Sequence, residues 1–139
     1  MDTVQTGVLS TINPDGSPHA VPVHFVFLNG MIYIHCGAHG QKYENILRSE
    51  RVSFTAWEMS GYSHNNNPEP CRTGTDYRSV VLSDNAKIVD DTALKRKVLE
   101  AFALKYTPHK DSDNIPEEAV SRTCVIEICG EMTEKAKGC

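Results

Sequence analysis

The sequence lacks the features of membrane-spanning, secreted and nucleic-acid-binding proteins. No apolar run approaches the roughly 18 residues that a membrane-spanning helix needs. The formal net charge is −4 at pH 7, and this acidic balance argues against nucleic acid or an anionic membrane surface as the main partner. The first residues are polar and include Asp2, without the basic and apolar regions of a signal peptide.

The cysteine content is that of a reduced protein. The five cysteines include no Cys-x-x-Cys pair, and their odd number does not suit a disulfide framework. We interpret them as free thiols and expect a cytoplasmic protein. They are Cys36, Cys71, Cys124, Cys129 and Cys139.

The composition is that of one globular domain. Hydrophobic residues make up 40% and charged residues 23% of the 139 residues, which are ordinary proportions for a folded domain. We therefore treat residues 1–139 as a single domain with its own core. Two turns are clear from the sequence, at Asn13–Gly16 and at Asn29–Gly30.

The hydrophobic pattern predicts a mainly β (α+β) fold. We expect about six antiparallel strands and two principal helices, arranged as a small closed or split β-barrel. The first helix begins near Gln41, the second runs from a cap at Asp90 or Asp91 to about Tyr106, and a short helical turn follows at 117–122. The strands are expected at 7–12, 18–28, 31–35, 51–57, 77–89 and 123–128.

The strand expected at 18–28 is apolar on both faces. One small barrel interior covers only one of these faces, so the other predicts a dimer interface. Pro22 lies within this strand and has no N–H, which predicts a sheet edge or a bulge there. An edge near Pro22 would leave neighbouring backbone groups free for a ligand.

The segment 31–47 carries the strongest functional signal. It begins as an apolar strand, Gly37 and Gly40 break the pattern, and helical spacing starts at Gln41. A helix that follows a glycine-containing loop presents unpaired N–H groups and a partial positive charge, which suit a phosphate. Lys42 lies in the first turn, at the positive end of the helix dipole, where its charge costs about 0.3–1 kcal/mol of stability. A bound anion would offset this cost. The alternative is a solvated surface lysine.

Several short motifs occur in a fixed order along the chain. The motifs are Gly-Val-Leu-Ser-Thr from Gly7, Asp15–Pro18, Val21–Val23, Ile32–His35, Gly40–Lys42, Tyr77–Val80 and a helix ending Lys105–Tyr106. In this order and spacing the sequence resembles the pyridoxamine-5′-phosphate-oxidase-like FMN-binding split barrels, and it is most similar to their nitroimidazole-resistance branch. It departs from the family at His19, where an aromatic residue is common. It also lacks the arginine-rich C-terminal motif of the true pyridoxamine phosphate oxidases, so we expect another substrate.

The resemblance implies a homodimer with FMN held between the subunits. The FMN phosphate would meet Lys42 and the loop 36–40, Arg78 and Ser79 would close the other side, and the backbone of residues 20–23 would face the isoalloxazine ring. The alternative for Arg78 and Ser79 is a wet strand face without a ligand. The expected cofactor-binding residues are Ala20, Val21, Pro22, Val23, Cys36, Gly37, Ala38, Gly40, Gln41, Lys42, Arg78 and Ser79.

Four histidines surround Cys36 in the sequence, namely His19, His24, His35 and His39. Imidazole and thiolate are metal ligands, but this spacing matches no zinc pattern, so we expect no metal site. His35 ends a strand beside the loop and is the candidate catalytic residue, since imidazole exchanges protons near neutral pH. We interpret His24 as a hydrogen-bonded core or interface residue, Cys36 as a small buried hydrophobe and Trp57 as a core residue.

Two function classes remain open from the sequence. The first is an FMN-dependent oxidoreductase that reduces a nitroaromatic, nitroimidazole-like or other small organic substrate. The second is a non-catalytic flavin- or haem-binding protein of the same fold, because a fold does not determine an activity. In the first case we expect the loop 64–76 to be mobile and to border the substrate side of the flavin. FMN and a related deazaflavin are not distinguished.

Overall fold

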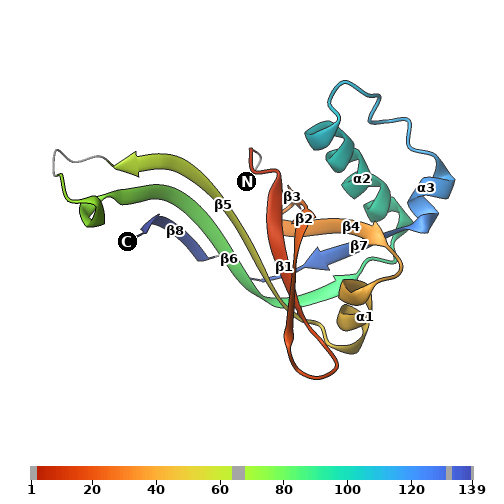
Figure 1. Cartoon of the computed structure of the whole chain (residues 1–139). Helices are drawn as coiled ribbons and strands as arrows, with labels where there is room; N and C mark the ends of the chain where they lie inside the picture. The colour runs from red at the N-terminus through yellow and green to blue at the C-terminus, as the bar shows by residue number, and fades with distance from the viewer. Residues whose placement is uncertain (1–2, 64–67, 131–132, 139) are drawn as a thin grey trace.

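The computed structural model of the chain describes residues 3–63, 68–130 and 133–138. These residues form eight strands, three α-helices and one short 3₁₀-helix at Pro70–Arg72 (Figure 1). The strands are β1 (Thr6–Ile12), β2 (Pro18–His24), β3 (Val26–Leu28), β4 (Met31–Gly37), β5 (Arg51–Ser63), β6 (Gly74–Ile88), β7 (Thr123–Ile128) and β8 (Thr133–Gly138). The helices are α1 (Gln41–Arg48), α2 (Thr92–Tyr106) and α3 (Glu117–Arg122).

The strands form one antiparallel sheet in the order β2-β1-β5-β6-β7-β4-β3, with β8 paired to β6. The two ends of this path, β2 and β3, are not paired with each other within the described residues, so the sheet curls without closing. The expected α+β fold of a split β-barrel is confirmed. The sheet edge expected at Pro22 is also present, since β2 pairs only with β1 in the described part of the chain.

The long strand expected at 18–28 is interrupted. β2 ends at His24 and β3 begins at Val26, on different edges of the sheet. At the break, the N–H of Phe25 donates to Oη of Tyr106 at 3.0 Å, and the Tyr106 hydroxyl lies 2.6 Å from the carbonyl oxygen of Gln5. A hydroxyl on α2 therefore replaces the strand partner that this buried backbone group would otherwise need.

Two further corrections concern strand number and length. The described residues form eight strands where six were expected, because of the break at Phe25 and because β8 adds a strand beside β6. β5 continues to Ser63 instead of ending near Trp57, with a bulge between Met59 and Gly61. Figure 1 shows the consequence: β5 and β6 extend together as a long arm, with β8 beside β6.

The local signals read from the sequence are present at the expected places. Asn29 and Gly30 have φ of 52° and 82°, the pair of positive values that a two-residue hairpin turn requires. Gly16 has φ of 84° and closes the first turn by donating from its N–H to the Asn13 carbonyl at 2.9 Å. Asp91 caps α2 by accepting hydrogen bonds from the N–H groups of Ala93 and Leu94.

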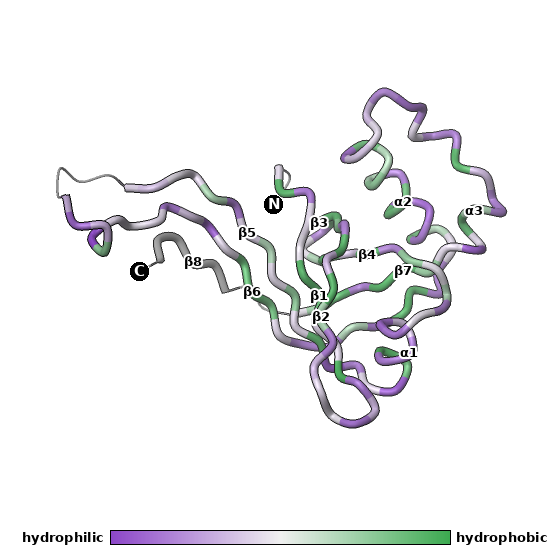
Figure 2. The backbone as a smooth tube through the Cα atoms, viewed as in Figure 1, coloured by the Kyte–Doolittle hydropathy of each residue, from purple (hydrophilic) through white to green (hydrophobic). Residues whose placement is uncertain are grey.

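The buried apolar side chains form two clusters. The larger one joins α1 to the curled sheet and includes Leu9, Phe25 and Phe54, which are fully buried. The smaller one lies under α2 and includes Val98 and Phe102. Burying each such side chain contributes roughly 1.5–3 kcal/mol. Figure 2 shows the contrast with the α2–α3 connection, which is mostly hydrophilic. No helix in the described ranges is long and apolar enough to cross a membrane.

Candidate functional site

The first turn of α1 follows Gly40, whose φ of 96° is a conformation that favours glycine. No side chain caps this turn. The first backbone hydrogen bond of the helix runs from the N–H of Glu44 to the Gly40 carbonyl, at 3.1 Å. The N–H groups of Gln41, Lys42 and Tyr43 are therefore those that a helix leaves without an internal partner, at the positive end of its dipole.

Asn45 fixes this helix end against the β1–β2 hairpin. Its side chain is fully buried, and it donates to Oγ1 of Thr11 at 2.9 Å and to Oδ1 of Asn13 at 3.0 Å. It also accepts hydrogen bonds from Gln41 and Arg48. The sequence reasoning missed this residue, since a single asparagine on a helix gives no signal of its own. The network holds the uncapped turn in place.

Lys42 lies near the end of β4, where His35 and Cys36 are found. Partial burial lowers the pKa of His35 below its ordinary value, and the charges of His24 and Lys42 act in the same direction. The hydrogen bond with Cys124 lowers the pKa of Cys36, and the charge of Lys42 adds to it. Three of the expected site residues, from a strand end and a helix start, are thus brought together around one positive charge.

A row of four rings connects this end of β4 to β2. The ring of His35 meets Phe102 edge-on at 4.4 Å, Phe102 stacks on Tyr106 at 5.7 Å, and Tyr106 stacks on His24 at 4.5 Å between ring centroids. His24 is exposed within one chain, so it is not a core residue, and its interpretation as an interface residue stays a prediction. The family motifs include Tyr106, and no motif includes Phe102. Their place in this row was not predicted.

The expected ring-facing segment, Ala20–Val23, lies on the edge strand β2. Ala20 and Pro22 are exposed, Val21 is half-buried and Val23 is buried. Pro22 and Val23 line a hollow of about 340 Å³ with His24 and Thr6. The segment therefore presents its backbone edge next to one end of the aromatic row.

The loop before α1 is compact. Gly37, Ala38 and Gly40 are exposed, and Cys36 is half-buried and packs against the core, close to its interpretation as a buried hydrophobe. A Cβ at Gly37 would lie 2.5 Å from the ring of His39, so the loop is folded back on that ring. The loop leads directly from β4 into α1, whose second residue is Lys42.

The side chain of Gln41 borders a different hollow, of about 570 Å³, between α1 and the β1–β2 turn. Asp15 and Glu44 also line it. Hydrogen bonds from Ser17 hold the pKa of Asp15 below its usual value, so this carboxyl is ionised at neutral pH. Two carboxylates make this hollow unfavourable for a phosphate.

Arg78 and Ser79 lie apart from these residues, on the β5–β6 arm. They line a hollow of about 160 Å³ with Trp57 and Glu58, and Glu58 stands directly opposite Arg78 in the sheet. No hydrogen bond or shared hollow in the described residues joins them to Lys42. Within one chain, the structure therefore does not bring the two halves of the expected site together.

The arm also carries most of the exposed large apolar side chains. Trp57 is 49% exposed, Met59 53% and Tyr62 59%. The interpretation of Trp57 as a core residue is wrong, because β5 has already passed beyond the core at this point. Trp57 and Met59 share one face of the sheet with Val81, which is 40% exposed.

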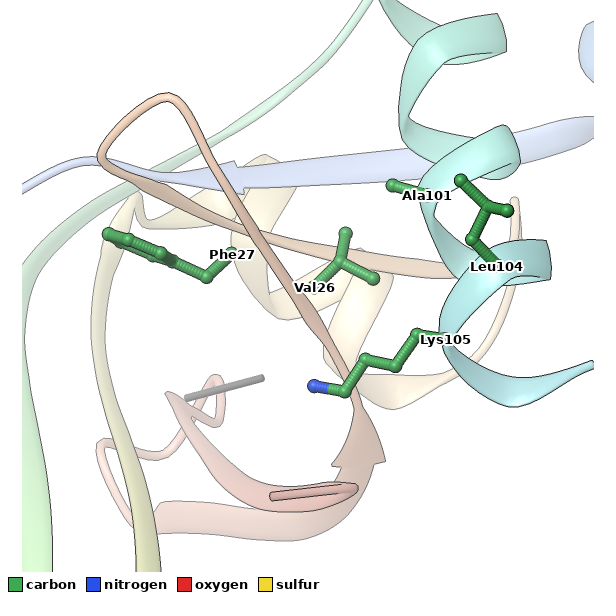
Figure 3. Close-up of a pocket in the computed structure, with 5 residues that line it drawn as sticks. All are labelled: Val26, Phe27, Ala101, Leu104 and Lys105. Atoms are coloured by element: carbon green, nitrogen blue, oxygen red, sulfur yellow. The ribbon is translucent and has the colours of Figure 1, made fainter. Parts of the chain in front are cut away.

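A further hollow of about 430 Å³ lies between β3 and α2 (Figure 3). Val26, Phe27, Ala101 and Leu104 provide apolar walls. Lys105 reaches from α2 toward the strand break, where its Nζ donates to the carbonyl of Phe25 at 3.0 Å. The described residues hold no cluster of three or more side chains suited to a metal ion.

A family model described as pyridoxamine 5′-phosphate oxidase matches residues 1–132 of the chain. The chain belongs to this family. The match covers every element that builds the site, from β1 to β7, and the family is the one that the ordered motifs of the sequence indicate. A search of curated proteins gave no match.

Solved structures of the same fold include flavin and haem proteins of low sequence identity. A candidate 5-nitroimidazole antibiotic resistance protein from Bacteroides thetaiotaomicron is 23% identical over 98% of this chain and 79% of its own, with a TM-score of 0.80. A flavocytochrome from Azotobacter vinelandii is 18% identical over 99% of this chain and 64% of its own, with a TM-score of 0.80. An FAD- and haem-binding protein from Mycobacterium smegmatis is 15% identical over 98% and 67%, with a TM-score of 0.73. These similarities establish the shared fold.

Proposed function

We propose that this protein is an FMN-dependent oxidoreductase that acts as a homodimer on a small organic substrate, of which nitroaromatic and nitroimidazole-like compounds are the first candidates. One observation carries the proposal: the uncapped first turn of α1, with Lys42 half-buried beside His35 and Cys36. Family membership and the fold shared with a candidate nitroimidazole-resistance protein support it.

The donors around Lys42 fit the phosphate of FMN. A phosphate monoester carries nearly two negative charges at neutral pH. The helix start offers backbone N–H groups at the positive end of a dipole, and Lys42 offers a charge-assisted hydrogen bond. Apart from His39, the loop Cys36–Gly40 is built of small residues, which lets its backbone approach a bound group closely. Gln41 would contribute its backbone N–H, since its side chain is bonded to Asn45.

The isoalloxazine ring would lie against the edge of β2 at Ala20–Val23, where unpaired backbone groups accept and donate hydrogen bonds. When bound, FMN supplies the electron transfer, and the protein supplies position and electrostatics. His35 is the catalytic residue of this proposal. Its lowered pKa leaves the imidazole mostly neutral at pH 7, so its role is to relay a proton taken from solvent to the reduced substrate.

A second subunit completes the site in this proposal. The exposed apolar face with Trp57, Met59 and Val81 is suited to burial against another copy of the chain. Ser79 shares that face, so its burial would carry Ser79 of one subunit toward the Lys42 side of the other, whereas Arg78 lies on the opposite face with Glu58. A contact between subunits would account for the separation of Ser79 from Lys42 within one chain.

The second candidate function is non-catalytic binding of a flavin or haem. Two histidines, His24 and His35, flank the aromatic row of Phe102 and Tyr106, and imidazole is a common haem ligand. Haem-binding proteins are among the structures that share the fold.

The visible spectrum of the purified protein separates the two functions. We expect FMN uptake, bleaching of the flavin bands by a chemical reductant, and reoxidation without oxygen on addition of a nitroimidazole. Stable flavin binding without reoxidation by any nitroaromatic compound would favour the non-catalytic flavin-binding protein. A Soret band on adding haem, with no uptake of FMN, would replace the flavin proposal by the haem alternative.

A further inference from the structure

Cys36 on β4 and Cys124 on β7 stand directly opposite each other in the sheet. Opposed residues of an antiparallel pair have Cα atoms about 4.5–5.5 Å apart and side chains on the same face. A disulfide spans Cα separations of about 4.4–6.8 Å. The register therefore meets the backbone requirement for a bond between the two sulfurs.

We propose that Cys36 and Cys124 form a dithiol site that hydroperoxides oxidise to a reversible cross-strand disulfide. The oxidation requires neither FMN nor the proposed enzymatic activity. The pair lies one position from the end of the β4–β7 ladder, where Gly37 opposes Thr123.

The surroundings of the two sulfurs give them different roles. Cys36 is half-buried, and its thiolate accepts a hydrogen bond from Cys124 and interacts with the nearby charge of Lys42. The same hydrogen bond and burial raise the pKa of Cys124, which is 5% exposed and stays protonated. Cys36 is thus the accessible nucleophile, and Cys124, directly opposite it in the sheet, is the resolving thiol.

The oxidation proceeds in two balanced steps. The thiolate of Cys36 attacks one oxygen of hydrogen peroxide, the O–O bond breaks, and hydroxide leaves and is protonated by solvent to water. Cys36 is then a sulfenic acid. The sulfur of Cys124 attacks this sulfur, the S–O bond breaks, and the hydroxyl group leaves as water with the proton of Cys124. Two thiols are oxidised to one disulfide while one peroxide is reduced to two waters.

The other described cysteines lack these features. Cys71 lies exposed on the 3₁₀-helix. Cys129 lies 3.4 Å from the carboxylate of Glu127, and partial burial together with that contact raises its pKa. Neither has a cysteine opposite it in the described strand pairings, so Cys71→Ser and Cys129→Ser are matched controls for the loss of one thiol.

The test is peroxide treatment of the full-length protein, followed by alkylation of the remaining thiols and peptide mapping. We expect a Cys36–Cys124 cross-linked peptide that dithiothreitol removes, in wild type and in both control variants. Cys36 should react roughly three- to fourfold faster at pH 7 than an ordinary thiol of pKa near 8.5, because its larger thiolate fraction outweighs the lower nucleophilicity of a more acidic thiol. In Cys124→Ser, or in Cys124→Ala if serine unfolds the core, dimedone should trap a sulfenic acid at Cys36.

Three results would overturn the proposal. One is oxidation of Cys71 or Cys129 before Cys36. Another is accumulation of dimedone-labelled Cys36 in the folded wild type without any cross-link. The third is a cross-link that forms only between chains, which non-reducing electrophoresis would detect.

Discussion

Lys42, in the first turn of α1, lies close enough to Cys36, at the end of β4, for its ammonium group to favour the Cys36 thiolate. The hydrogen bond with Cys124 and, after it, this charge lower the pKa of Cys36 to about 7. In the proposed site, the phosphate of FMN needs the same ammonium group. Thiolate and phosphate therefore compete for Lys42, and each should weaken the other's interaction with it.

The first prediction follows from this competition. As the pH rises from 6 to 8, the FMN affinity of the reduced wild type should fall by roughly fivefold relative to that of Cys36→Ser. This factor is at the lower end of the usual couplings between two binding sites. The thiolate forms across this interval, since the pKa of Cys36 is about 7. The serine variant is the control, because the phosphate's own titration affects both proteins equally. Parallel pH profiles in fluorescence titrations would contradict the coupling.

The lowered pKa of His35 predicts a pH-dependent contribution to stability. Burial and nearby charges depress this pKa below 6.5 in the folded protein, so the unfolded chain binds the proton more readily. The free energy of unfolding should therefore fall as the pH drops through the ordinary histidine pKa. His35→Gln should lose less stability than wild type between pH 7.5 and pH 5 in urea titrations. An equal loss in the two proteins would show that His35 makes no such contribution.

The exposed arm predicts dimerisation through β5. Trp57→Glu should shift the protein toward monomer by placing a charge on the apolar face, and it should weaken FMN binding at the same protein concentration. Lys97→Glu, an exposed charge change on α2, is the control and should alter neither property. Light scattering over a dilution series measures the shift. A wild-type protein that is monomeric at micromolar concentration while binding FMN tightly would refute the shared site.

Tyr106 predicts a measurable cost at the strand break. Tyr106→Phe removes the acceptor of the Phe25 N–H, which leaves a buried donor unpaired and should cost about 1–3 kcal/mol of unfolding free energy. Tyr43→Phe is the matched control, since the described residues show no hydrogen bond for its hydroxyl. Equal denaturant midpoints for wild type and Tyr106→Phe would mean that water replaces the Tyr106 hydroxyl as the hydrogen-bond partner of the Phe25 N–H.

The turns and the helix cap could be read from the sequence because their causes are local. Asn29–Gly30 adopts positive φ, and Asp91 caps α2, through residues within a few positions. The break at Phe25 could not be read in this way, because its hydrogen-bond partner lies 81 residues away. The exposure of Trp57 also escaped, since an alternating strand looks the same whether its far face meets a core or solvent.

For the site, sequence and family motifs led to the loop and to Lys42, which follow one another along the chain. They did not lead to Asn45 or to the aromatic row, which depend on contacts between distant elements. The loop predicted at 64–76 includes residues 64–67, which lie outside the described residues. The rest of that segment includes a 3₁₀-helix and the start of β6, so it is shorter as a loop than expected.

The central claim is that the start of α1 binds the phosphate of FMN, and Lys42→Ala tests it most directly. The variant should fold as well as wild type, because the lysine charge that it lacks gains nothing from the helix dipole. Loss of a charge-assisted bond should cost about 1.5–3 kcal/mol of FMN binding, roughly a tenfold to hundredfold loss of affinity. Lys97→Ala, on the exposed face of α2, is the control and should bind FMN as wild type does.

The decisive measurement is a titration of FMN and of riboflavin, which lacks the phosphate, into wild type and Lys42→Ala. The account predicts a loss of affinity for FMN and almost none for riboflavin. Equal FMN affinity in the two proteins, or an equal loss for both flavins, would contradict it.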